Sequence, residues 1–103
     1  MANILITEAL SAKAHRLKSE LANQTVIMGD FNDVPAVMLK NGMIMKLPHP
    51  EAVAYPHQIL TFCLDNNVDV VYALNTGEYN ALQPAMQLFV EYGIEIQFVE
   101  NDL

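Results

Sequence analysis

The stretch Asp69-Val70-Val71-Tyr72-Ala73-Leu74 decides the fold, because it is the strongest strand signal in the chain. An unbroken run of β-branched, aromatic and apolar residues is typical of a strand buried on both faces of a parallel sheet. The next four residues, Asn75-Thr76-Gly77-Glu78, match a capping box, in which the first and last side chains bind free backbone N–H groups at a helix start. The stretch therefore predicts a buried strand followed at once by a helix that begins near Thr76.

Strand and helix signals alternate along the rest of the chain. The other predicted strands are 3–7, 25–30, 43–45 and 94–99. Two of the other predicted helices are 11–22 and one between residues 51 and 67. A third, short helix is capped by Asp33 and has Val34-Pro35 in its first turn. The helix after Thr76 is expected to reach Tyr92 with a bend or break at Pro84. In the last strand Ile94, Ile96 and Phe98 alternate with other residues, which indicates a half-exposed sheet edge.

This alternation predicts the α/β class, because parallel strands need crossover helices. We expect a three-layer α/β/α, Rossmann-like fold with a five-stranded, mainly parallel sheet in the order 3-2-1-4-5. The chain has 103 residues, 52% of them hydrophobic and 17% charged, which suits one globular domain, 1–103. No apolar run approaches the ~18 residues that cross a bilayer, so a membrane is not an expected partner.

The charges are unevenly distributed. The formal net charge is −7, all five basic residues precede residue 47, and eight of the twelve acidic residues follow it. Such a chain repels a phosphate backbone, so nucleic acid is not an expected partner. The single cysteine, Cys63, allows no internal disulfide and fits a core position. The N-terminus lacks the pattern of a secretory signal, and we expect a cytoplasmic protein.

A ligand crevice is predicted where the strand order reverses. In an open doubly wound sheet, ligands bind beyond the carboxyl ends of the strands at this switch point, which lies here between the first and fourth strands. The candidate ligand-binding residues follow strand ends: Thr7, Glu8, Asp30, His49, Asn75, Thr76 and Glu78. Three of them are carboxylates that should converge. Like charges in one crevice favour a ligand with an amine or amide over a phosphate.

Several of these residues also have ordinary structural interpretations. Glu78 serves equally well as the capping-box acid, and Asp30 as an acid that ends a strand. His49 lies between two stiff prolines, but it has no spacing to His15 or His57 that suggests a metal site. We predict no metal site and no catalytic residue, because no nucleophile and base stand in a recognisable pair.

No cofactor is predicted either. The turn Glu8-Ala9-Leu10-Ser11-Ala12 lacks the glycines that let a backbone approach a dinucleotide, so NAD and FAD are not expected. A P-loop sequence occurs nowhere in the chain, and Mg-ATP should not bind. A phospho-acceptor receiver needs an Asp after the third strand and a Lys after the last, and neither is present.

Three groups of residues resemble a known family: Ile4-Leu5-Ile6-Thr7 near the start, Asn67 to Leu74 followed by Glu78, and Tyr92-Gly93-Ile94 before the last strand. With these residues the whole chain resembles the Rossmann-like domain that precedes the catalytic core of ATP-grasp enzymes, as in carbamoyl phosphate synthase large chains and biotin carboxylases. Family members often carry glycines after the first strand, where this chain has Glu8 to Ser11. The sequence also ends where the family continues into its ATP-binding core.

The resemblance implies a non-catalytic, pre-ATP-grasp-like domain. It would bind a small acceptor substrate or regulator at the strand ends, for a separately encoded ATP-grasp ligase. The alternative is a scaffold or oligomerisation module of the same fold without ligand binding. In either case we expect a homodimer, or a heteromer with an ATP-grasp core, that uses Ile96, Phe98 and the neighbouring helix face.

Overall fold

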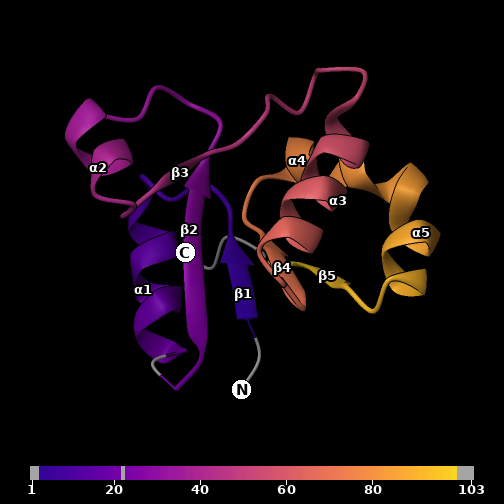
Figure 1. Ribbon diagram of the computed structural model, residues 1–103, viewed down its shortest axis with the longest axis horizontal. Coiled ribbons are helices and arrows are strands. Elements are labelled where there is room, and N and C mark those ends of the chain that lie inside the picture. The colour runs from indigo at the N-terminus through magenta and orange to yellow at the C-terminus, as the bar shows by residue number, and fades with distance from the viewer. Residues whose placement is uncertain (1–2, 22, 100–103) are drawn as a thin grey trace.

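Five parallel strands form one sheet in the order β3-β2-β1-β4-β5, as the sequence predicts (Figure 1). The computed structural model describes residues 3–21 and 23–99. The strands are β1 (Asn3–Ile6), β2 (Thr25–Asp30), β3 (Met45–Lys46), β4 (Val70–Ala73) and β5 (Glu95–Phe98). The helices are α1 (Ala12–Glu20), α2 (Ala36–Lys40), α3 (Tyr55–Asp65), α4 (Thr76–Leu82), the short 3-10 helix η1 (Gln83–Ala85) and α5 (Met86–Glu91).

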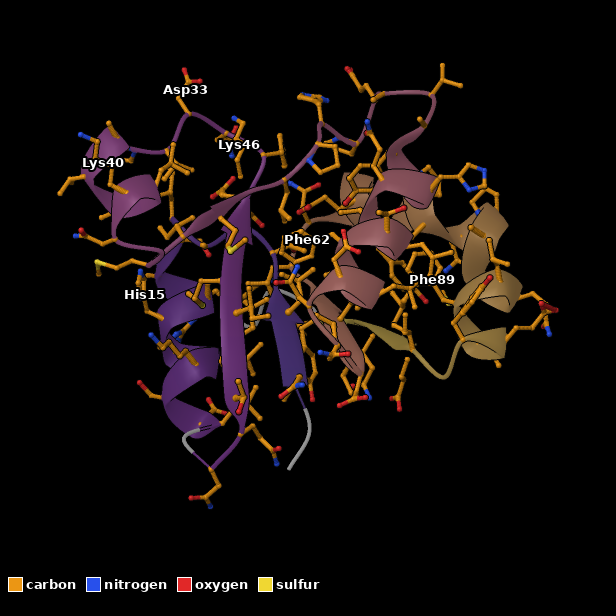
Figure 2. All side chains as sticks on the ribbon, in the orientation of Figure 1. His15, Asp33, Lys40, Lys46, Phe62 and Phe89 are labelled. Carbon is orange, nitrogen blue, oxygen red and sulfur yellow. The ribbon has the colours of Figure 1, made fainter. Side chains whose placement is uncertain are left out.

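The helices cover both faces of the sheet, which gives the three predicted layers (Figure 1). Side chains alternate along each strand, so Leu5 of β1 and Val71 of β4 pack in one core with α3, α4 and α5. Ile4 and Ile6 point to the other face, into a second core with α1. Figure 2 shows Phe89 on the inner side of α5, where it is fully buried in the first core. Cys63 is also fully buried in that core, and burial raises the pKa of its thiol to about 12.

The sheet register brings the ends of β1 and β4 together. Ile6, the last residue of β1, pairs with Met28 of β2 on one side and with Tyr72 of β4 on the other. The chain leaves β1 towards α1 on one face and leaves β4 towards α4 on the opposite face. The strand ends therefore diverge, and the switch point of the sheet lies between them.

Some predicted boundaries need correction. Asp33 does not cap α2: the helix begins at Ala36, Pro35 stands at its N-cap, and Asp33 lies at the tip of the preceding loop (Figure 2). The third strand is Met45–Lys46 and not 43–45. Ala22, the expected last residue of the first helix, lies outside the described residues.

The break expected at Pro84 is confirmed, because α4 ends at Leu82 and η1 separates it from α5. Pro56 lies in the first turn of α3, where its missing N–H costs nothing. Gly93 has a φ of 76°, the left-handed conformation that ends α5 and turns the chain into β5. Over the ranges 3–21 and 23–99, the structure contains no helix with the length and apolar character to cross a membrane.

Candidate functional site

A polar hollow of about 480 Å³ lies at the switch point of the sheet. Its polar lining residues are Glu8, Ser11, Lys13, Arg16, Asn75 and Thr76. The first four come from the β1–α1 connection and α1, and the last two follow β4. We call this feature the switch-point hollow. It stands where the prediction put a ligand crevice, between the first and fourth strands.

Helix α1 provides the basic wall of the switch-point hollow. The Ser11 side chain caps the helix by accepting a hydrogen bond from the Ala14 N–H at 3.1 Å. Lys13 and Arg16 then follow three residues apart, a spacing that puts both on one side of the helix. The Lys13 Nζ donates to the carbonyl oxygens of Leu74 (3.4 Å) and Val99 (3.0 Å), so its ammonium is held beside the strand ends. The Arg16 side chain is exposed.

Glu8 provides the acidic group. Its backbone φ is 55°, a left-handed conformation that is uncommon for residues other than glycine, and its carbonyl accepts a hydrogen bond from the Ser11 N–H at 3.0 Å. The side chain is half-buried. Burial raises the pKa of Glu8 above 4.5, the nearby Lys13 opposes the rise, and the charge of Asp30 adds to it. The Glu8 carboxylate thus lines the switch-point hollow together with the cationic side chains of Lys13 and Arg16.

The opposite wall is the start of α4. The Asn75 side chain accepts hydrogen bonds from the backbone N–H groups of Gly77 (2.7 Å) and Glu78 (3.3 Å), as the capping box predicts. Thr76 is exposed at the rim. The other half of the capping box does not form, because the Glu78 carboxylate turns into the core and bonds with Tyr55.

Glu78 is a fully buried carboxylate behind the hollow. Its Oε2 accepts a hydrogen bond from the Tyr55 hydroxyl at 3.3 Å, and its Oε1 makes no hydrogen bond with any described residue. Burial raises the pKa of Glu78 to about 7. The charges of Glu8 and Asp30 add to the rise, whereas the hydroxyls of Thr7 and Tyr55 oppose it. The three predicted carboxylates are thus close enough for their charges to interact, but only Glu8 lines the switch-point hollow, because Asp30 and Glu78 are buried.

Thr7 and Asp30 tie the strand ends together. The Thr7 Oγ1 accepts from the Leu74 N–H at 3.0 Å and donates to the Tyr72 carbonyl at 3.4 Å, which joins β1 to β4. Asp30 is fully buried, and its carboxylate accepts from the Leu10 N–H at 3.0 Å and from the backbone and side chain of Asn32. These contacts hold the turn after β1, and with it Glu8, against the end of β2.

His49 does not line the switch-point hollow. It is exposed, its ring stands edge-on to Phe31 with centroids 4.8 Å apart, and its Nδ1 accepts from the Glu51 N–H at 3.1 Å. His15 lies on the outer side of α1, away from the sheet (Figure 2). No cluster of three or more His, Cys, Asp or Glu side chains suited to a metal ion occurs in the described ranges.

The sequence thus predicted some of the residues that line the switch-point hollow and missed others. Of the predicted residues, Glu8, Asn75 and Thr76 line the switch-point hollow. Ser11, Lys13 and Arg16 were missed; Lys13 and Arg16 were assigned to solvent, because charged residues on an amphipathic helix ordinarily mark its solvated face. The available signal was positional: Lys13 and Arg16 occupy the first turns of the helix that leaves the switch point. With them present, the lining carries both signs of charge, and the expected preference for an amine or amide over a phosphate stays a prediction.

Comparison with known proteins adds no assignment. The chain matches no protein-family model, and no curated protein is significantly similar to it.

Proposed function

We propose that this chain is a non-catalytic, pre-ATP-grasp-like domain whose switch-point hollow binds a small acceptor substrate or regulator for an ATP-grasp ligase. The observation that carries the proposal is the position and lining of the hollow: it lies at the switch point of a parallel sheet, where small ligands of such sheets bind. The link to ATP-grasp ligases rests on the resemblance of the residues around β1, β4 and β5.

The lining residues define the class of ligand. The exposed guanidinium of Arg16 suits a carboxylate, which it can hold through two parallel N–H donors. Glu8 suits an amine, and Asn75 and Thr76 offer neutral polar groups at the rim. The ligand that fits this lining is a molecule of amino-acid size with a carboxylate and an amine.

A thermal-shift series with three small probes tests this assignment. Acetate carries only the carboxylate, ethylamine only the amine, and β-alanine both. We expect β-alanine to raise the melting temperature more than either of the other probes at equal concentration, because a ligand that binds the folded state alone stabilises it by mass action. Equal shifts with all three, or none, would count against the proposal.

Matched variants connect the effect to the switch-point hollow. Arg16→Gln should abolish the β-alanine shift, whereas Lys18→Gln, an exposed cation on the same helix that is not part of the lining, should leave it intact. Glu8→Gln and the exposed control Glu20→Gln form the same comparison for the acidic side. Loss of the shift in the control variants would indicate a general charge effect.

The alternative function, a scaffold without a small ligand, is favoured by a different observation. The molecule exposes an apolar hollow beside its last strand, described below. The two hollows share no lining residue, so the ligand site and the apolar surface can be tested with separate variants.

A further inference from the structure

A second hollow, of about 340 Å³, lies between α5 and the start of β5. Its lining is mostly apolar, with Met86 and Val90 from α5, Ile94 just before β5 and Ile96 within it. Val90 is 58% exposed and Tyr92, in the following turn, is 56% exposed. Side chains of this kind on the surface, gathered around a depression, are typical of a contact site for another polypeptide.

Beside this apolar hollow runs an open strand edge. Within residues 3–21 and 23–99, β5 is the last strand of the sheet and pairs only with β4 (Figure 1). Glu95 and Val99 donate their N–H groups towards β4, to the carbonyls of Asp69 (2.9 Å) and Ala73 (3.0 Å). In a parallel strand the alternate residues point the other way, so Ile96 and Phe98 present their N–H and C=O groups to the free edge. An added strand could bond with these groups.

The edge is acidic. Glu91 on α5 and Glu95 on β5 are both exposed, and Glu95 accepts a hydrogen bond from the Gln97 side-chain amide. The sequence has no Lys or Arg after Lys46. A segment that lies along β5 is therefore close to negatively charged carboxylates, and no basic residue from this half of the chain neutralises their charge.

We propose that β5 binds an extended segment of a partner protein in which aliphatic and basic residues alternate. The segment adds to the sheet through the free groups of Ile96 and Phe98 and seats an aliphatic side chain in the apolar hollow, and its alternate Lys or Arg residues point to the other face of the sheet, towards Glu95. This inference does not depend on the switch-point hollow or on its ligand.

Charge favours such a partner over a second copy of the chain. A two-fold symmetric contact uses the same patch twice, so it would bring together Glu91 and Glu95 of both copies without an intervening base. Like charges at an interface oppose association. Of the two assemblies expected from the sequence, the structure thus argues for the heteromer.

Two synthetic hexapeptides test the proposal on the full chain. One alternates lysine and valine, and the other replaces each lysine with glutamate. Each is titrated into the isotopically labelled protein and followed by NMR. We expect the lysine peptide to shift signals in the range 90–98 and to bind at least about tenfold more tightly than the glutamate peptide, with affinity that falls as salt is added.

Three variants separate specific docking from general attraction to an acidic protein. Glu95→Lys should weaken the lysine peptide about two- to fivefold, as expected for an exposed pair, whereas Glu20→Lys on α1 makes the same charge change and should have no effect. Val90→Ser should weaken both peptides, because it removes an apolar wall without disturbing a buried residue. Equal affinity for the two peptides, shifts centred outside 90–98, or self-association of the chain through β5 would each overturn the proposal.

Discussion

At Glu8 the backbone is left-handed, and that conformation costs a residue with a side chain about 1–2 kcal/mol relative to the right-handed one. Strain of this kind often marks functional positions. Here it coincides with a half-buried carboxylate in the lining of the switch-point hollow. The turn orients the carboxylate, and the hydrogen bonds of Asp30 hold the turn.

Two substitutions at this position separate backbone strain from charge. Glu8→Gly relieves the left-handed strain, and we expect the free energy of unfolding to rise by up to ~1 kcal/mol after the entropy cost of glycine. Glu8→Gln keeps the strain and should change stability by no more than about 0.5 kcal/mol. Urea unfolding of both variants checks this, and a loss of stability in Glu8→Gly would show that the side chain is needed for folding.

Glu78 predicts a specific pH dependence of stability. Its pKa rises from an ordinary 4.5 to about 7 in the folded protein, so between these pH values the unfolded chain loses a proton that the folded chain keeps. Stability due to Glu78 is therefore fully present below pH 4.5 and falls by about 3 kcal/mol as pH rises through 7.

The neutral variant Glu78→Gln should lack this decline, and the difference in unfolding free energy between wild type and variant should favour the variant more at pH 8 than at pH 5. Glu20→Gln, at an exposed position, is the control. A difference that does not change with pH would show that Glu78 ionises normally inside the fold. The sequence could not reveal this state, because an inward-facing glutamate and a capping-box glutamate have the same spacing from Asn75.

Among the elements, α1 does most to form the candidate site. Its cap residue Ser11 and its first-turn cation Lys13 both line the switch-point hollow, and Lys13 also joins the helix to the ends of β4 and β5. The position of α1 at the switch point follows from the order of the strands. The roles of its charged residues do not follow from sequence, since the same residues could equally face solvent.

The start of α1 can be tested independently of any ligand. Ser11→Ala removes the side-chain acceptor for the Ala14 N–H and should cost about 1 kcal/mol. Ser19→Ala, near the other end of the helix, removes only a bond from the Ser19 hydroxyl to the His15 carbonyl and should cost less. Thermal or urea unfolding compares the two variants. An equal loss of stability would show that the Ser11 cap contributes no more than an ordinary side-chain hydrogen bond of the helix.

The strands were the most predictable elements. Val70 to Ala73 form a continuous apolar run because helices cover both faces there, and β5 alternates because Glu95 and Gln97 face solvent. The start of α2 was less predictable: Asp33 has the chemistry of a cap, but Pro35 is the N-cap residue, with a φ of −52° and no side-chain hydrogen bond.

On the scale of the whole molecule, the polar switch-point hollow and the apolar hollow beside β5 have different lining residues. The first suits a small charged ligand, and the second, next to the exposed Glu91 and Glu95, suits a basic polypeptide segment. The five basic residues lie before residue 47, so the cations of the first hollow and the carboxylates of the second come from different parts of the chain. Sequence predicted this imbalance and the fold, but the opposite charges of the switch-point hollow depend on Lys13 and Glu8 meeting in three dimensions.

The most direct test of the central claim is a titration of the labelled protein with β-alanine, followed by NMR. We predict saturable shifts confined to residues 8–16 and 74–76, and no such shifts in Arg16→Gln. Saturable shifts that map elsewhere on the molecule, or shifts in 8–16 and 74–76 that persist unchanged in Arg16→Gln, would contradict the assignment of the switch-point hollow as the ligand site.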